Sequence, residues 1–196
     1  MTDSSPPIIP VLRGPVPLSH LLLQSFVRDG HYAVDATCGN GHDTLLLARL
    51  VGTRGHVWGF DIQRQAVEET GRRIAEAGLA NRVTLLPLGH EDLQEQVAVP
   101  LQVVLFNLGY LPGGDRSIIT RPDTTGSALE QSLGLLAAGG VVIVTVYPGH
   151  DGGSAEQDAV ERWAAGLDPR AFHCWRMGQT NVTPTAPYLL LVQKGL

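Results

Sequence analysis

The chain has 196 residues, of which 43% are hydrophobic and 17% charged, and its formal net charge is -5. This length and composition predict one globular domain with a sizeable core and exclude a disordered or polyelectrolyte chain. The apolar segment 8–23 is interrupted by prolines and Arg13, so we expect neither a membrane span nor a signal peptide. The two cysteines and seven histidines lack metal-ligand spacing, so we expect no metal site and a reduced, cytoplasmic protein.

Strand and helix patterns alternate along the chain after a Pro-rich start. Residues 1–17 are predicted to form an irregular arm, and Ser19 is predicted to cap a helix over 21–27. The elements expected next are a strand at 32–35, a helix at 43–50, a strand at 55–61, a helix at 63–77, strands at 82–87 and 101–108, a helix at 123–138 ended by Gly139-Gly140, a strand at 141–147, a helix at 154–165, and an antiparallel pair of strands at 172–177 and 188–193. This order predicts an α/β fold, with one domain over 18–196 built on a doubly wound, mostly parallel sheet with one antiparallel edge strand.

A glycine-containing turn, Asp35-Ala-Thr-Cys-Gly-Asn-Gly-His-Asp-Thr44, follows the first predicted strand. Gly39 and Gly41 permit a tight turn that leaves the backbone open to a ligand. Asp61 ends the next strand, where a carboxylate suits the two hydroxyls of a ribose. Thr44 replaces the third glycine of a dinucleotide fingerprint, so the spacing favours S-adenosylmethionine over a nicotinamide or flavin cofactor.

The loop after the third strand, Gly89-His-Glu-Asp92, is expected to reach the same edge of the sheet. Two interpretations of His90 stay open. The imidazole either faces an adenine ring or caps a helix that begins near Glu91.

A polar segment, Asn107-Leu-Gly-Tyr110, follows an almost wholly apolar strand. Its spacing is similar to the N-P-P-Y motif of amino-group methyltransferases, in which the Asn carbonyl accepts a hydrogen bond from the amine and the aromatic ring offers a stacking face. Asp115 or water is a candidate acceptor for the proton of the amine, although Asp115 also suits a simple turn. Cys38 has no paired base nearby in the sequence, so we do not expect it to act as a nucleophile.

Four segments, Val34–Thr44, Gly59–Gln63, Phe106–Asp115 and Tyr147–Gly153, together resemble the bacterial family labelled "putative rRNA methylase". The resemblance covers essentially the whole domain and implies the Rossmann-like class I methyltransferase fold with a seven-stranded sheet. It also implies S-adenosylmethionine as cofactor, with S-adenosylhomocysteine as product. Characterised members methylate the aminomethyl group of a thiouridine at the tRNA wobble position, which implies an RNA N-methyltransferase acting on a tRNA anticodon loop.

The resemblance also implies a set of site residues. Cofactor contacts are implied at Asp35, Asn40, Gly41, His42, Asp61, Gln63, His90 and Glu91, and the candidate set is completed by Thr37, Gly39, Asp43, Thr44, Ile62 and Asn107. The candidate catalytic residues are Asn107, Tyr110 and Asp115, and the candidate substrate contacts are His20, His150 and, for phosphate groups, Arg13, Arg116 and Arg121.

Two other functions stay open at this point. Methylation of rRNA or of a small-molecule amine is favoured by the acidic net charge and by the segment 181–188, which departs from the family pattern, as does Pro148 after Tyr147. A non-catalytic S-adenosylmethionine-binding module is disfavoured by the loop around Asn107, which pure binding does not require. A homodimer is also considered, because an anticodon stem-loop needs more surface than one small domain offers.

Overall fold

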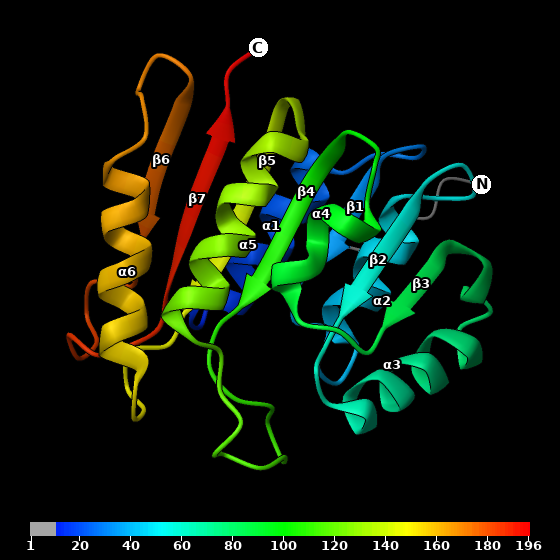
Figure 1. The fold of residues 1–196 in the computed structure, drawn as a ribbon, viewed down its shortest axis with the longest axis horizontal. Helices are drawn as coiled ribbons and strands as arrows, with labels where there is room; N and C mark the ends of the chain where they lie inside the picture. Colours follow the sequence, from blue (N-terminus) through cyan, green and yellow to red (C-terminus); the bar gives the residue numbers. More distant parts are fainter. Residues whose placement is uncertain (1–10) are drawn as a thin grey trace.

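The computed structural model describes residues 11–196 and is built around one seven-stranded sheet in the order β3-β2-β1-β4-β5-β7-β6 (Figure 1). The strands are β1 (Tyr32–Asp35), β2 (His56–Phe60), β3 (Val83–Leu86), β4 (Leu101–Asn107), β5 (Leu136–Val146), β6 (Phe172–Met177) and β7 (Tyr188–Lys194). The first five pair in parallel, whereas β7 runs antiparallel to both of its neighbours. The predicted mostly parallel, seven-stranded α/β sheet is confirmed, and its reversed strand, β7, lies one place in from the edge strand β6.

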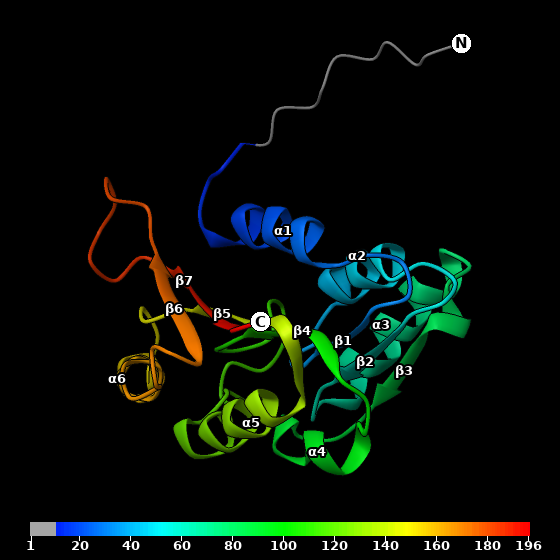
Figure 2. The ribbon, with the colours of Figure 1, turned by 90° about the horizontal axis from the view of Figure 1, so that it is seen from above.

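Helices cover both faces of the sheet, as Figure 2 shows from above. One face carries α1 (Pro15–Phe26), α2 (His42–Leu50) and α3 (Arg64–Glu76), and the other carries α4 (Leu93–Gln96), α5 (Pro122–Leu135) and α6 (Gly153–Ala165). Short 3₁₀ turns, η1 (Ala80–Arg82) and η2 (His90–Asp92), precede β3 and α4. Within residues 11–196, no helix combines the length and the apolar character that crossing a bilayer requires.

The central strand β4 shows why the sequence forms this layered core. Successive side chains of a strand point to opposite faces, so a strand covered on both sides must be apolar at nearly every position. Val103 and Leu105 pack into the core under α1 to α3, whereas Val104 and Phe106 pack into the core under α4 to α6. After the apolar run from Val103 to Phe106, Asn107 is the next polar residue, and it lies at the carboxyl end of the strand.

Two predicted boundaries are wrong by more than one residue. Helix α1 begins at Pro15, and Ser19 lies inside it with its hydroxyl donating to the Val16 carbonyl (2.8 Å), so Ser19 is not the cap. Proline is favoured in the first turn of a helix because its missing N–H has no intrahelical partner there. The predicted irregular arm therefore ends by Gly14, and its first ten residues lie outside the described part of the chain.

The second wrong boundary is that between α5 and β5. The residues Leu136, Ala137 and Ala138 belong to the strand, so Gly139-Gly140 lies within β5 and does not end the helix. The pairing of β4 with β5 shifts register at this point, and a Cβ on Gly140 would lie 2.8 Å from the Leu101 carbonyl oxygen. Glycine inside a strand commonly marks such an irregularity, where another backbone approaches closely.

Candidate active site

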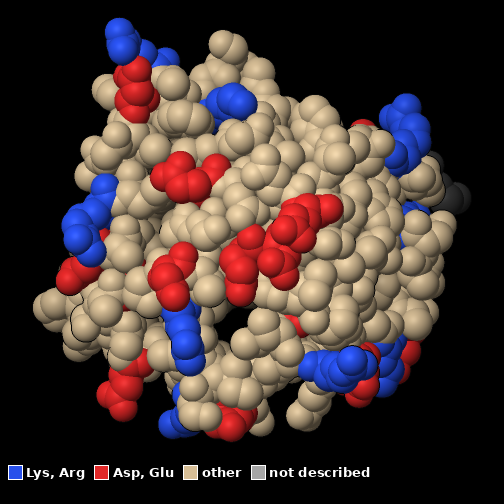
Figure 3. Space-filling view, in the orientation of Figure 1, with Lys and Arg blue, Asp and Glu red and all other residues tan. Residues whose placement is uncertain are grey.

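Two cavities lie at the carboxyl ends of the parallel strands and share part of their walls. The larger, of about 750 Å³, includes His20 from α1, and we call it the His20 cavity. The smaller, of about 520 Å³, includes Asp61, and we call it the Asp61 cavity. Figure 3 shows the face that carries α4 and α5 hollowed at this end of the strands. Both cavities are lined by Thr37, Gly39, Asn107, Gly109, Tyr110 and Pro112, which form the junction between them.

The turn between β1 and α2 is supported from behind by two buried side chains. Asp35 and Thr44 are completely buried, and the Thr44 hydroxyl donates to Asp35 Oδ2 (2.6 Å). Burial, followed by the nearby Asp43 carboxylate, raises the pKa of Asp35 to about 7. Neither Asp35 nor Thr44 lines a cavity, so their position does not support the predicted direct cofactor contacts. Both residues hold the turn in place.

The turn itself is held against α3. Thr70 donates its hydroxyl to the Gly39 carbonyl (2.8 Å), and Arg73 Nε donates to the Asn40 carbonyl (2.8 Å). Gly41 has φ +77°, and a Cβ on it would lie 2.7 Å from Thr70 Oγ1. Glycine is therefore required at Gly41 both by the backbone conformation and by the close approach of α3.

Asp61 and His90 give the Asp61 cavity its polar groups. The Asp61 carboxylate accepts hydrogen bonds from the backbone N–H groups of Gly39 (3.0 Å) and Gln63 (2.9 Å), while burial raises its pKa. His90 is 7% exposed, and its Nδ1 donates to the Ala36 carbonyl (3.3 Å), because a carbonyl oxygen only accepts. Its buried Nε2 is consequently an acceptor without a hydrogen-bond partner in the described chain.

The structure does not support one of the two interpretations of His90, that of a helix cap. Its side chain makes no capping hydrogen bond to the short helical segment that follows, and it lines the Asp61 cavity. Burial lowers the pKa of the imidazole, which favours the neutral form. The Asp61 carboxylate suits the ribose hydroxyls and the neutral His90 suits the adenine amino group, so both fit the adenosine part of the expected cofactor.

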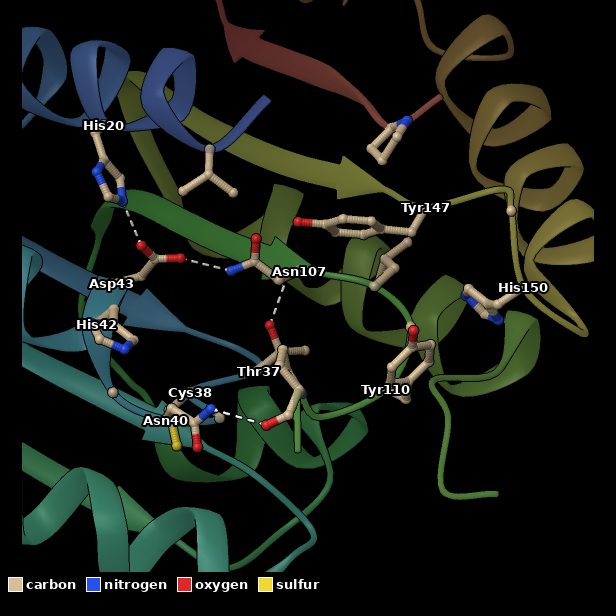
Figure 4. Close-up of a pocket in the computed structure, with 18 of the residues that line it drawn as sticks. His20, Thr37, Cys38, Asn40, His42, Asp43, Asn107, Tyr110, Tyr147 and His150 are labelled. Carbon is tan, nitrogen blue, oxygen red and sulfur yellow. Dashed lines mark hydrogen bonds and ion pairs between the residues drawn. The ribbon is translucent and has the colours of Figure 1, made fainter. Parts of the chain in front are cut away.

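At the junction, Asn107 is bonded on two sides (Figure 4). Its backbone N–H donates to Thr37 Oγ1 (2.7 Å), and its side-chain Nδ2 donates to Asp43 Oδ2 (2.8 Å). The other oxygen of Asp43 accepts a hydrogen bond from His20 Nε2 (2.6 Å). These side chains come from α1, α2 and the end of β4, which the topology brings to one edge of the sheet.

An aromatic group stands beside Asn107 at the mouth of the cavities. The rings of Tyr110 and His150 meet edge to face with centroids 5.8 Å apart, and the Arg116 guanidinium lies 5.3 Å from the centre of the Tyr110 ring. Tyr110 is 37% exposed, so part of its ring remains available to a ligand. The phenol ring of Tyr147 also lies beside Asn107, on the side away from Asp43, as Figure 4 shows.

Asp115 and Cys38 are poorly suited to chemistry. Asp115 is exposed and accepts hydrogen bonds from the backbone N–H and the hydroxyl of Ser117 (2.8 Å each), and these bonds lower its pKa. Asp115 lines neither cavity, so its geometry is that of a turn residue and does not support the predicted proton acceptor. Burial raises the pKa of the Cys38 thiol, which agrees with the expectation that Cys38 is not a nucleophile.

The loop after β4 is fixed to the helical layer by a buried carboxylate. Glu156 of α6 is 2% exposed and accepts hydrogen bonds from the hydroxyls of Thr120 and Thr125 (2.7 Å each). Thr120 Oγ1 in turn accepts a hydrogen bond from the Gly109 N–H (2.8 Å). The two ends of the loop from Gly109 to Thr120, which lines both cavities, are therefore joined to each other, and Glu156 holds the Thr120 end.

The structure brings most of the predicted site residues to the two cavities. The His20 cavity contains His20, Thr37, Gly39, Asn40, Gly41, His42, Asp43, Asn107, Tyr110 and His150, and the Asp61 cavity adds Asp61, Ile62, Gln63, His90, Glu91 and Arg121. Besides Asp35, Thr44 and Asp115, the candidate phosphate contacts Arg13 and Arg116 line neither cavity. Several lining residues were not predicted from the sequence, among them Val16, Tyr147, Thr185 and Pro187. They come from three distant parts of the chain that no single motif links, although Tyr147 begins one of the family segments and Thr185 and Pro187 lie in the departing segment 181–188.

Comparison with known proteins identifies one family and several close relatives. The profile of the family described as "Putative rRNA methylase" matches residues 57–193. An Arabidopsis thaliana protein named tRNA (mnm(5)s(2)U34)-methyltransferase, chloroplastic, is 38% identical over 187 residues, which span 90% of this chain and 68% of that protein.

Two solved structures are similar over nearly their whole length. The "putative rRNA-methylase" of Clostridium thermocellum is 41% identical with a TM-score of 0.91, and the match covers 94% of this chain and 99% of that chain. A "putative methyltransferase" of Streptococcus mutans, solved in complex with S-adenosylhomocysteine (SAH), is 34% identical with a TM-score of 0.85 and the same two coverages.

Proposed function

This chain belongs to the rRNA methylase family and is an S-adenosylmethionine-dependent methyltransferase; from that premise we propose that it N-methylates the aminomethyl group of a modified wobble uridine in tRNA. The observation that carries the proposal is the position of Asn107. Its side chain stands where the two cavities meet and donates through Nδ2 to Asp43, which leaves Oδ1 facing the cavity. A carbonyl oxygen at that point is suited to accept a hydrogen bond from an acceptor amine.

We assign the two cavities to the two ligands. The Asp61 cavity takes the adenosine of the cofactor, with Asp61 on the ribose hydroxyls and His90 Nε2 accepting from the adenine amino group. The turn from Gly39 to Gly41 carries the methionine part, and the His20 cavity takes the nucleoside that presents the amine. In this arrangement the methyl group lies close to Asn107.

The residues at the junction have little bond-making to perform. When bound, S-adenosylmethionine supplies a methyl group already activated by its sulfonium, so the amine nitrogen bonds to the methyl carbon as the carbon–sulfur bond breaks, and its electron pair stays on the sulfur of SAH. Asn107 orients the amine, and orientation of this kind supplies much of the rate enhancement in such transfers. The amine must be neutral to react, and we assign the acceptance of its protons to water in the His20 cavity.

The RNA is proposed to dock on the side of the His20 cavity. Figure 3 shows acidic side chains gathered over α4 and α5, and an acidic surface repels a polyanion. Tyr110, with Arg116 over its ring, offers a stacking face of the kind that proteins use for unstacked bases in loops. Arg13 is a further candidate for a phosphate contact, whereas Arg121 lines the Asp61 cavity, which is assigned to the adenosine. The Arabidopsis relative is named a tRNA methyltransferase, which supports tRNA as the substrate class.

The test uses purified protein, cofactor labelled in its methyl group, and tRNA whose wobble uridine ends in a free aminomethyl group. We expect label in tRNA at the wobble nucleoside and no label in tRNA that already carries the terminal methyl. Asn107→Ala should lower transfer about 100-fold or more while the affinity for SAH stays within about twofold of wild type. Label in rRNA alone, or in a small-molecule amine alone, would contradict the proposed substrate. Full transfer by Asn107→Ala would contradict the assigned role of Asn107.

A further inference from the structure

Asp43 lies between the side chains of Asn107 and His20 and accepts a hydrogen bond from each of them. Its Oδ2 accepts from Asn107 Nδ2 (2.8 Å), and its Oδ1 accepts from His20 Nε2 (2.6 Å). The Asp43 side chain is 14% exposed and that of His20 is 34% exposed, so the connected groups form the wall of the His20 cavity (Figure 4). The sequence predicted Asp43 as a cofactor contact, but in the structure each of its oxygens already has a protein partner.

The contact with Asp43 determines which way the Asn107 amide points. A primary amide has a donor end and an acceptor end of nearly equal shape, and only its partners distinguish the two orientations. A carboxylate accepts hydrogen bonds and donates none. The amide end that faces Asp43 must therefore be the NH₂ group, and the carbonyl oxygen of Asn107 must face the other way, into the cavity.

The two orientations would act differently on an amine. With the carbonyl oxygen toward the cavity, Asn107 accepts an N–H of the amine and leaves the nitrogen lone pair free to react. With the amide reversed, its NH₂ group would donate to the same lone pair and compete with the reaction. A donor at this position also offers nothing to the amine hydrogens, which would then be left without an acceptor.

We propose that Asp43, itself held in place by His20, is a positioning residue for methyl transfer that locks the Asn107 amide with its carbonyl oxygen toward the acceptor amine. This inference rests on the proposed N-methyltransferase function, because the amide orientation matters only for an acceptor that carries N–H groups. His20 contributes the outer hydrogen bond and thereby ties α1 to the site. Helix α1 also contributes Val16 to the same cavity. The packing of α1 and the orientation of the Asn107 amide therefore depend on the same two hydrogen bonds of Asp43.

The first test compares Asp43→Asn with wild type. A carboxamide at this position has nearly the same shape but can present either an oxygen or an NH₂ group to Asn107, so the amide loses its fixed orientation. We expect the single-turnover rate at saturating cofactor and RNA to fall about tenfold or more, while the dissociation constant of SAH stays within about twofold. A large loss of SAH affinity with an unchanged saturated rate would overturn the proposal and make Asp43 a cofactor contact.

A double-mutant cycle separates action through Asn107 from any independent role of Asp43. If Asp43 acts through Asn107, then Asp43→Asn costs nothing further in an Asn107→Ala background, and the double variant is as slow as Asn107→Ala alone. If the two losses multiply, the proposal is wrong. His20→Gln, which keeps an N–H donor, should retain more of the rate than His20→Ala. His173→Ala, on the exposed edge strand β6, is the matched remote control and should behave as wild type.

An observation without any acceptor distinguishes failure of this inference from failure of the proposed function. The chain has four asparagines, Asn40, Asn81, Asn107 and Asn181, so selective ¹⁵N labelling gives four side-chain amide pairs in an NMR spectrum. We expect the Asn107 pair to show slow amide rotation and slow hydrogen exchange in wild type and to lose both in Asp43→Asn. An Asn107 pair that is unchanged in Asp43→Asn overturns the positioning role whichever acceptor is methylated. A wild-type protein that shows these NMR properties but methylates no amine overturns the proposed function alone.

Discussion

The two cavities are built from different kinds of sequence. Several polar groups of the Asp61 cavity, among them Asp61 and His90, come from short segments after β1, β2 and β3, which are marked by a local pattern such as Gly39-x-Gly41 or the acid that follows β2. Its remaining polar groups come from the end of β4 and the loop that follows. The His20 cavity is also lined by the turn after β1, but its other walls come from α1, the turn after β5 and residues Thr185 and Pro187 before β7, which no local pattern links. A shared wall around Asn107 connects the two.

This difference separates what the fold requires from what the substrate requires. Loops at the carboxyl ends of neighbouring parallel strands converge whatever the acceptor is, so one cofactor site can serve many substrates. The acceptor side depends on contacts between distant segments, such as the hydrogen bond of Asn107 with Asp43 across 64 positions. We therefore expect changes in the turn after β1 to affect cofactor binding and folding. Changes in the residues that α1, the turn after β5 and the segment before β7 contribute to the His20 cavity should affect the acceptor alone.

The largest effect is expected for Gly41→Ala. The left-handed backbone at φ +77° costs a non-glycine residue about 1–2 kcal/mol, and the new Cβ would meet Thr70 Oγ1 at 2.7 Å, which adds about as much again. We expect a loss of about 3 kcal/mol in the free energy of unfolding and at least a tenfold weaker affinity for SAH, measured by urea denaturation and calorimetry. Gly78→Ala is the matched control, because it has φ +70° but no atom within 4 Å of the new Cβ. Equal losses in both variants would show that the approach of α3 is unimportant.

Glu156→Ala should impair the use of both ligands, because Glu156 holds the loop that lines both cavities. The change leaves the hydroxyls of Thr120 and Thr125 without their acceptor and releases the loop that lines both sides. We expect a loss of about 2 kcal/mol in stability, together with weaker SAH binding and slower transfer. Asp158→Ala, an exposed change on the same helix, should stay within about 0.5 kcal/mol of wild type. If only one ligand is affected, the loop belongs to that cavity alone.

Local sequence patterns predicted the bounds of some elements and the shared location of the Asp61 cavity residues, but they misplaced the end of α5. The bounds of β1 and β6 were predicted to the residue, and the predicted convergence of Gly39, Asp61 and His90 is confirmed as a shared location. Periodicity and turn residues suffice for this, because both are local properties. The end of α5 was misplaced because Gly139-Gly140 has the local pattern of a helix end, and only its pairing partner β4 shows that it lies in a strand.

The acceptor side shows why residue type alone is insufficient. Asp43 was grouped with the cofactor contacts because it lies in the glycine-containing turn, yet its hydrogen bonds go to Asn107 and His20. Glu156 had no signal in the sequence, since an acid in the first turn of a helix usually has no role beyond favouring the helix dipole. Tyr147 was noted only through the residue after it. In each case the missing information was a tertiary partner.

Asp35 offers a pH-dependent measure of how the turn after β1 is supported. Because its folded pKa is raised from the usual value of 3.8 to about 7, the stability it contributes is present at low pH and is lost as the pH rises through about 7. Asp35→Asn has no such ionisation. We therefore expect wild type to lose about 1 kcal/mol relative to Asp35→Asn between about pH 6 and about pH 8, measured by denaturation at each pH. A difference that does not change with pH would show that Asp35 is ionised throughout this range.

The smallest effect is expected for Tyr110→Ala, which tests whether the shared wall contacts the RNA or the cofactor. Tyr110 lines both cavities, so its position alone does not decide which ligand its ring serves. Because stacking on an unpaired base contributes about 1 kcal/mol or more, Tyr110→Ala should lower kcat/KM for RNA about fivefold or more. The affinity for SAH should change less than about twofold, and Tyr110→Phe should keep most of the activity because it keeps the ring. If SAH binding falls in parallel with RNA use, the ring serves the cofactor, and the boundary between the two cavities lies on the acceptor side of Tyr110.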